Sequence, residues 1–432
     1  MNVAEQVMPR KRKIFYGWWM VGAATILNFF MGGTFIYGFT VFFNPIRNTF
    51  GWGAAVTSIA FTLQRLEAGF LEVLVGYLVD KVGPRKLMLA GWSVVGLGFL
   101  LMSRVDALWS FYGAFLIIAT GLNFAAFVVI FTTIANWFEK RRSRAMTVVA
   151  TGFGASGTLV PLIALMVGEL GWRETLTVVG VGLWLIGIPL SSLMKHKPAQ
   201  YGYLPDGASQ EETSELESAS GFKSVKERAK EQARSFTVRE AVRTRAFWLL
   251  SGVAFFQFVG ASAVMVHIVP YLESVNISTT MAATTVTGVT VCSLIGRLGF
   301  GFLGDFANKR YLIAIGITLQ MIGIFVLSFI NMDRVWIIIP FLLTYAPGFG
   351  ATMPLRPALQ ADYFGTDNYG TIMGLMMLVS MVGGLASPIV AGWIFDVTGS
   401  YNLAWLIYAM VTFPAIPFML LAKPPRVAQV VS

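Results

Sequence analysis

The stretch Thr280–Leu303, TMAATTVTGVTVCSLIGRLGFGFL, sets the interpretation of the whole chain. It is long enough and apolar enough to cross a bilayer core as one helix. Its one ionised side chain is Arg297, two to three turns before a charged loop that opens at Asp305. A guanidinium in an apolar helix normally faces a protein interior or a wet cavity, and its planar fork matches a carboxylate. We therefore expect Arg297 to anchor an anion, with a structural ion pair as the alternative.

The composition of the chain is that of a polytopic membrane protein. Of the 432 residues, 56% are apolar and only 12% are charged, which is about half the charged fraction of a soluble domain. The net charge of +10 sits in short clusters between apolar runs, a pattern that indicates membrane topology and no nucleic-acid partner. The lone Cys292 provides no disulfide or thiolate metal site. We expect no metal, no cofactor and no enzyme activity.

Twelve apolar runs predict an all-α membrane protein with twelve transmembrane helices. The runs begin near Ile14, Ala54, Leu87, Ala107, Arg144, Arg173, Ala246, Thr280, Tyr311, Val335, Tyr369 and Asn402. Lysine and arginine gather in the loops on one side of these runs, so both termini should face the cytoplasm across the cytoplasmic membrane. The basic cluster Lys140–Arg144 should mark this topology and contact lipid headgroups, without a role in substrate binding.

Markers in the first half of the chain return in the second at offsets of 225 to 227 residues. They are Gly76-x-x-x-Asp80 with Arg85, repeated as Gly301-x-x-x-Asp305 with Arg310; Asn136-Trp137-Phe138, repeated as Asp362-Tyr363-Phe364; and Pro161, repeated as Pro388. A parallel repeat of six helices plus six places the binding site between the halves near the membrane midplane. We assign residues 1–194 and 246–432 to the two halves.

Residues 195–245 form the predicted cytoplasmic linker. Its stretch 209–235 is charged and poor in apolar residues, so it should be flexible or loosely helical. Thr237 and Glu240 have capping-box spacing, which predicts a short helix over Val238–Thr244 on the membrane surface. A plain linker without this helix is the alternative.

The repeated loops at Asp80 and Asp305 are predicted gates. A carboxylate at a helix end can pair with an arginine of the facing half or with a helix N-terminus, and such contacts would close the cytoplasmic side. The alternative is that these charges only fix topology. In the fifth span, the glycines at positions 152, 154 and 157 precede Pro161, which predicts close helix packing, a flexing gate, or both.

Few other polar residues lie inside the spans. Asn123, Tyr345 and Tyr37 can hydrogen-bond a carboxylate, and His267 and Glu67 are candidate proton carriers. For each, a structural or interfacial role is the alternative. Glu72 lies about 140° around the helix from Glu67, so the two carboxyl groups should not share a face, and Glu67 is the better candidate.

The motifs resemble those of a known family. The segment from Gly76 to Arg85 resembles the signature loop of the major facilitator superfamily. Trp137-Phe138-x-Lys140-Arg141-Arg142-x-x-Ala145 resembles the fifth-span signature of the monocarboxylate transporters, and Tyr16-Gly17-Trp18-Trp19 resembles their first-span signature without its acidic residue. The linker start, from Lys197-Pro198 to Pro205-Asp206-Gly207, resembles bacterial relatives of the oxalate/formate antiporters. The resemblance implies the major facilitator fold and a substrate-binding arginine at Arg297.

The chain departs from these relatives at three positions. Ser293 stands where many monocarboxylate transporters have an aspartate, Tyr37 where they have a lysine, and Met376 where oxalate transporters have a lysine. One obvious guanidinium favours a monocarboxylate over oxalate. We expect a monomeric secondary transporter of lactate-, pyruvate- or formate-like monocarboxylates that works by alternating access as a proton-linked symporter. Carboxylate anion exchange and export of amphipathic organic compounds are the alternatives.

Overall fold

The computed structural model describes residues 14–125, 127–207 and 235–425, and every element in these ranges is helical. The charged stretch predicted to be flexible lies, apart from Ser235, outside the described residues. The twelve predicted starts all fall within three residues of a helix start. This agreement follows from the length of the apolar runs, which a bilayer core sets at about 20 residues.

The first half contains six spans. Span 1 is α1 (Tyr16–Met31), the π-helical turn η1 (Gly32–Ile36) and α2 (Phe39–Phe50). Spans 2, 3 and 4 are α3 (Ala54–Val82), α4 (Pro84–Ser103), and α5 (Leu108–Ala125) with α6 (Phe127–Trp137). Span 5 is α7 (Arg142–Ala155), the 3₁₀ turn η2 (Ser156–Leu159) and α8 (Val160–Leu170), and span 6 is α9 (Trp172–Ser192).

The second half repeats this pattern with longer unbroken helices. The short helix α12 (Val238–Arg243) leads into α13 (Arg245–Ser274), α14 (Thr279–Leu303) and α15 (Lys309–Leu327). The turn η5 (Met332–Ile337) precedes α16 (Ile338–Phe364), followed by α17 (Tyr369–Thr398) and the last span, α18 (Asn402–Thr412) with α19 (Ala415–Leu421). The predicted capping box of Thr237 and Glu240 is present at the start of α12.

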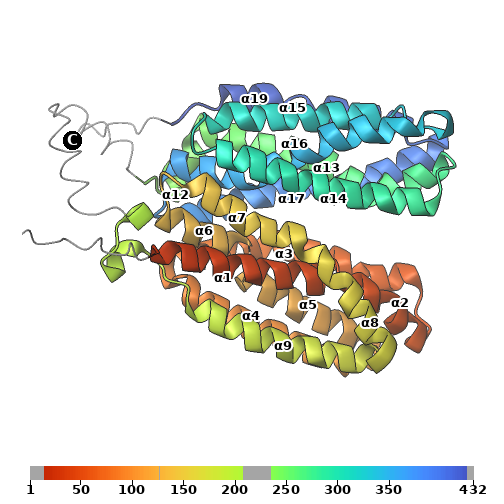
Figure 1. The fold of residues 1–432 in the computed structure, drawn as a ribbon, viewed down its shortest axis with the longest axis horizontal. Helices are drawn as coiled ribbons and strands as arrows, with labels where there is room; N and C mark the ends of the chain where they lie inside the picture. The colour runs from red at the N-terminus through yellow and green to blue at the C-terminus, as the bar shows by residue number, and fades with distance from the viewer. Residues whose placement is uncertain (1–13, 126, 208–234, 426–432) are drawn as a thin grey trace, which may run out of the picture.

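Eleven helical segments among the described residues are long and apolar enough to cross a membrane. The helix α3 is not one of the eleven, although its 29 residues exceed the length of a span. It carries the ionisable residues Arg65, Glu67 and Glu72, so its composition is more polar than that of its neighbours. Since α3 runs beside the other spans of the first half (Figure 1), we count it as the twelfth.

The helices pack as two bundles that lie side by side (Figure 1). One apolar core fills the first half and includes large side chains such as Trp92, Phe115 and Trp137. Two further cores lie in the second half, around Trp405 and around Phe247. The first core also includes Tyr369 and Met373 from the start of α17, so the halves share apolar packing at one end. That end carries the end of α9, the helix α12 and the start of α13, and we call it the linker end (Figure 1).

Two helix interruptions face each other in the first half. A Cβ added at Gly32 in η1 would overlap the Ser156 side chain at the start of η2, and one added at Gly33 would overlap Leu159 at its end. Beyond this contact, Gly38 just before α2 lies against Ile163 of α8. Spans 1 and 5 are therefore interrupted at the same place, and they pack together beyond it.

The start of the linker contacts both halves. The Asp206 carboxylate accepts hydrogen bonds from the backbone N–H groups of residues 139–141, at 2.7–3.1 Å, in the loop before α7. The Lys195 ammonium lies 3.9 Å from the ring centre of Tyr16 on α1. The Lys197 ammonium pairs with Asp367, between α16 and α17, at 2.6 Å. Among the described residues, the segment 195–207 thus binds mainly to the first half. The exposed ion pair of Lys197 with Asp367 connects it to the second half.

Candidate functional site

The Arg297 side chain is buried where α14 of the second half meets α7 of the first. Only 3% of the residue is exposed, and its Nη1 donates a hydrogen bond of 3.0 Å to the backbone carbonyl of Ala150. Its Nε has no partner, and the described residues place no carboxylate against the guanidinium. Among the described residues, the Ala150 carbonyl is the one hydrogen-bond acceptor found for this guanidinium.

The depth of Arg297 follows from its position in α14. Six residues separate it from the end of the helix at Leu303, so its Cα lies about 9 Å from the linker end. Side chains lean toward the N-terminus of their helix, which carries the guanidinium back toward mid-membrane. The site thus lies between the linker end and the midplane, somewhat closer to the linker end than the sequence repeat alone predicts.

Two first-half residues approach the guanidinium. Gly154 lies under it, since a Cβ added there would be 2.7 Å from Nη1. Tyr37 packs against Phe153 of α7 with 5.7 Å between ring centres and the rings tilted by 45°, and its hydroxyl is close enough to Arg297 for an electrostatic interaction. Of the predicted substrate contacts, the structure thus brings Tyr37 and Arg297 together.

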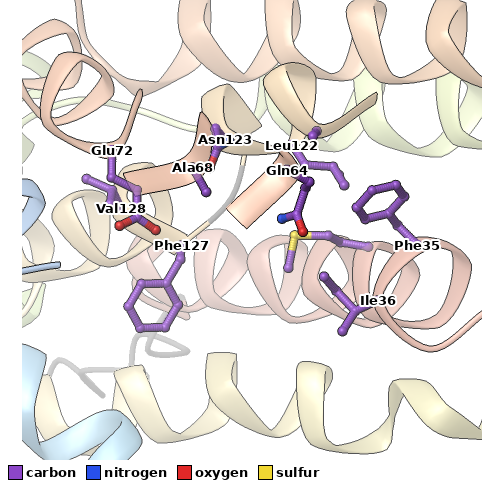
Figure 2. Close-up of a pocket in the computed structure, with 11 residues that line it drawn as sticks. Phe35, Ile36, Gln64, Ala68, Glu72, Leu122, Asn123, Phe127 and Val128 are labelled. Carbon is purple, nitrogen blue, oxygen red and sulfur yellow. The ribbon is translucent and has the colours of Figure 1, made fainter. Parts of the chain in front are cut away.

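Asn123 lines a separate cavity of about 150 Å³ within the first half. Figure 2 shows the cavity, which is bounded by α1, η1, α3, α5 and α6. Its polar lining consists of Gln64, Glu72 and Asn123, and the rest of its wall is formed by apolar or small side chains. Ile36 also lines this cavity, and Tyr37 is the next residue in the chain. The cavity and Tyr37 are therefore adjacent at the same turn of span 1.

The other predicted site residues lie apart from Arg297. Tyr345 is fully buried in a second-half core, stacked between Phe341 and Phe349. His267 lies 22 residues along α13 from the linker end, about 33 Å, and its Nε2 donates to the Pro388 carbonyl at 2.8 Å. Glu67 accepts a hydrogen bond from the Thr120 hydroxyl of α5.

Asp80 joins α3 to the N-terminus of α17 in the other half. Its carboxylate accepts hydrogen bonds from the backbone N–H groups of Gly370 and Thr371, at 3.0 and 2.9 Å, and from the Thr371 hydroxyl at 2.8 Å. A carboxylate in this position satisfies free N–H groups and is stabilised by the helix dipole. One turn earlier, Gly76 lies so close to Gly370 that a Cβ at either position would overlap the other's backbone.

Asp305 makes the equivalent contact in the opposite direction. Its carboxylate, 3% exposed, accepts a 2.9 Å hydrogen bond from the Ser143 N–H and forms a 2.9 Å ion pair with Arg144 at the start of α7. Burial raises the pKa of Asp305, while the hydrogen bond from Ser143 and the charge of Arg144 act in the opposite direction. The repeated aspartates thus join the two halves by a pair of pseudo-symmetric contacts, α3 to α17 and α14 to α7.

The remaining residues of the repeated loops have different surroundings. A Cβ at Gly301 would overlap the Thr147 side chain of α7, so this glycine permits close packing of α14 on α7. Arg310 donates a 3.0 Å hydrogen bond to the neighbouring Tyr311 hydroxyl, and Arg85 lies within electrostatic range of Tyr16. Neither arginine forms an ion pair with an aspartate among the described residues.

Two arginines of the basic cluster before α7 bind carboxylates of the second half. Arg142 has only 7% of its side chain exposed and pairs with Asp362 of α16, which also binds Lys309 at 2.8 Å. Arg144 pairs with Asp305, as described above. The expectation that this cluster mostly marks topology and contacts headgroups does not describe these two arginines, because they bridge the halves at the linker end.

Arg356 is a buried cation that the sequence analysis missed. It is 8% exposed on α16, and its Nη1 donates a 3.3 Å hydrogen bond to Gln257 on α13. Gln257 in turn donates to Gln320 on α15 at 3.1 Å and to Thr352 at 2.5 Å. The described residues place no carboxylate on Arg356. Its sequence signal is an arginine inside an apolar run, as for Arg297.

Comparisons with known proteins agree with this architecture. The sequence matches the family described as Major Facilitator Superfamily over residues 23–387, and again over residues 250–431. Monocarboxylate transporter 12 of Rattus norvegicus is 26% identical over 411 residues, which cover 91% of this chain and 84% of that protein. The oxalate:formate antiporter of Oxalobacter formigenes is 24% identical over 412 residues, which cover 92% of this chain and 89% of that protein.

A solved structure shows the same fold. The proton:xylose symporter XylE aligns with a TM-score of 0.73 at 14% sequence identity, over 94% of this chain and 96% of that one. The helical architecture, the repeat and the family match over most of the chain all indicate the same fold. The relatives are transporters and not enzymes, and the chain is an integral membrane transporter that belongs to the major facilitator superfamily.

Proposed function

We propose that this protein is a secondary active transporter of small monocarboxylates that works by alternating access between its two halves. The observation that carries the proposal is Arg297, a buried guanidinium at the contact between the halves with no carboxylate partner among the described residues. A buried cation without a counter-ion is costly, and a substrate carboxylate would supply one. The names of the relatives, a monocarboxylate transporter and an oxalate:formate antiporter, support the same substrate class.

The proposed cycle uses the contacts described above. The halves comprise residues 1–194 and 246–432, and the linker end faces the cytoplasm along with both termini. In the described arrangement the Asp80 and Asp305 contacts close the cytoplasmic side. Tyr37 lies on the first-half side of the bound carboxylate, and Asn123 lines the adjacent cavity. Binding to Arg297 neutralises the charge between the halves and favours their closure around the substrate.

Uptake by reconstituted protein tests this proposal. We expect proteoliposomes to exchange labelled lactate, pyruvate or formate, and Arg297→Lys to weaken binding by roughly 100-fold, because a point charge cannot replace a bidentate guanidinium pair worth about 3 kcal/mol. Arg104→Gln, which removes an exposed arginine at the end of α4, is the matched control and should exchange normally. Undiminished exchange in Arg297→Lys and Arg297→Ala would refute the role of this residue as anchor.

A second candidate function is exchange between carboxylates that include a dicarboxylate. Arg356 favours it, because this residue is a second buried guanidinium without a carboxylate partner among the described residues. The preference for a monocarboxylate assumed that the protein offers only one guanidinium. Counterflow of labelled oxalate against formate in the same vesicles distinguishes the two functions. Oxalate exchange faster than lactate exchange would favour this second function.

A further inference from the structure

We propose that Glu72 is the proton-binding site of this transporter, placed in a cavity apart from the substrate cation. The inference rests on the proposed carboxylate transport and adds to it the group that carries the coupled proton. Glu72 is on α3, and its carboxyl group lines the 150 Å³ cavity of the first half (Figure 2). The cavity also exposes Gln64 and Asn123, whose amide groups can hydrogen-bond a carboxyl group in either protonation state.

The carboxyl group of Glu72 has no hydrogen bond or ion pair with any described residue. Among the described residues, no basic side chain lines the cavity, and neither α5, α6 nor the α1–η1 segment contributes another titratable group to it. The nearest charges along α3 are Glu67 and Arg65, about 7.5 and 10.5 Å away along the helix axis. A carboxylate inside a membrane requires a neutralising partner, and here the partner available is a proton.

The two other candidate proton carriers lie outside the cavity. Glu67 accepts the Thr120 hydroxyl through Oε1, its Oε2 is buried without a hydrogen-bond partner among the described residues, and neither Glu67 nor His267 lines the cavity. The His267 ring bonds the Pro388 carbonyl through Nε2 and lies 3.2 Å from the Tyr401 hydroxyl through Nδ1, both within the second half. The geometry therefore favours Glu72 over Glu67, the reverse of the order expected in the sequence analysis.

Glu72 also lies on the line of contact between the halves. Its backbone carbonyl is so close to Gly374 of α17 that a Cβ at that glycine would overlap it. The Asp80 contact with Gly370 and Thr371 joins the same two helices about two turns farther on. The one charged residue of α17 is Asp396, which lies 22 residues beyond Gly374 along the helix. When α3 and α17 separate, the surroundings of Glu72 change, so proton affinity and the arrangement of the halves are linked.

The balance of charge follows from the two separate sites. A carboxylate anion binds Arg297 from the second half, and one proton adds to a carboxylate oxygen of Glu72 in the first half. The pair crosses with no net movement of charge, and each is released when its own site opens to the other side. The proposed reaction is therefore one-to-one symport of a monocarboxylate with a proton.

Infrared spectroscopy of the purified full-length protein tests the proton site without depending on transport. We expect a protonated-carboxyl C=O band that disappears as the pH is raised, and that is missing in Glu72→Gln. The band should persist in Glu72→Asp and in Glu169→Gln, which changes an exposed acid on α8. A band that is lost in Glu67→Gln and retained in Glu72→Gln would overturn the assignment.

Transport assays test the coupling. In proteoliposomes with a gradient of one pH unit, the wild type should accumulate lactate up to about tenfold, and Glu72→Gln should accumulate none while still exchanging lactate. Accumulation in Glu72→Gln equal to the wild type would overturn the coupling role.

If the wild type exchanged carboxylates but did not respond to the pH gradient, the proton inference would fail and the proposed function would stand. If it exchanged no carboxylate, the proposed function would fail, and the infrared titration would still decide the proton site.

Discussion

At the scale of single residues, Gly154 has the sharpest consequence for the site. It lies on α7 under the Arg297 guanidinium, and a Cβ there would be 2.7 Å from Nη1. We expect Gly154→Ala to displace the guanidinium from Ala150 and to weaken carboxylate binding without unfolding the protein. Gly157, three residues later, has open space around its Cβ position and is the matched control. Equal exchange kinetics for Gly154→Ala and Gly157→Ala would contradict this packing.

The sequence predicted some of these residues and missed others for physical reasons. Arg297 stands out because a lone guanidinium in an apolar run must find a polar environment. Arg356 presents the same signal in the segment from Pro354 to Pro357, and the sequence analysis overlooked it. The Ala150 carbonyl could not have been found, because a backbone acceptor carries no residue-type signal and its proximity to Arg297 depends on how two distant helices pack.

At the scale of helices, the contact between α3 and α17 depends on Gly76 and Gly370. Each lies against the other's backbone near the Asp80 contact. We expect Gly76→Ala to push the helices apart and to open the linker end, which labelling of an introduced cysteine on α17 would measure as faster modification. Gly182→Ala on α9, where the Cβ position is open, is the control and should leave labelling unchanged. Unchanged labelling in Gly76→Ala would show that this contact does not hold the gate shut.

The helices themselves were largely predictable. The length of an apolar run predicts a span, and the offset between Gly76 and Gly301 already paired the two repeated loops. The glycines before Pro161 had indicated a flexible region in span 5, where η2 lies. The break η1 in span 1 was not predicted, because it lies where Gly32 packs against Ser156, a contact between spans 1 and 5. The bridging role of Arg142 was also missed, since basic residues at a span end usually mark topology, and only packing shows that this side chain is buried.

At the scale of the whole molecule, the exposed pair of Lys197 and Asp367 should not contribute to pH dependence. The hydrogen bond from Lys197 lowers the pKa of Asp367 below its usual value near 3.9. Its stabilising effect is therefore complete above that value and is lost only as the pH falls through the lowered pKa. Because both side chains are partly exposed, the pair is worth at most about 1 kcal/mol.

We therefore expect Asp367→Asn to leave the pH profile of lactate exchange unchanged between pH 5 and 8. Exchange measured across that range with equal pH on both sides of the membrane checks this. A shifted profile would show that the linker contact titrates during the cycle.

The paired interruptions of spans 1 and 5 have a mechanical consequence. A helix bends most easily where its regular hydrogen-bond ladder is broken, and η1 and η2 break two neighbouring spans at the same level. Because α2 and α8 pack together beyond this level, we expect them to tilt as a single lid while α1 and α7 stay in place. A change in spin-label distance between α8 and α9 on adding lactate, with the α7–α14 distance constant, would report this motion. Such a lid would let the carrier occlude its cargo from both aqueous phases before the halves begin to rock.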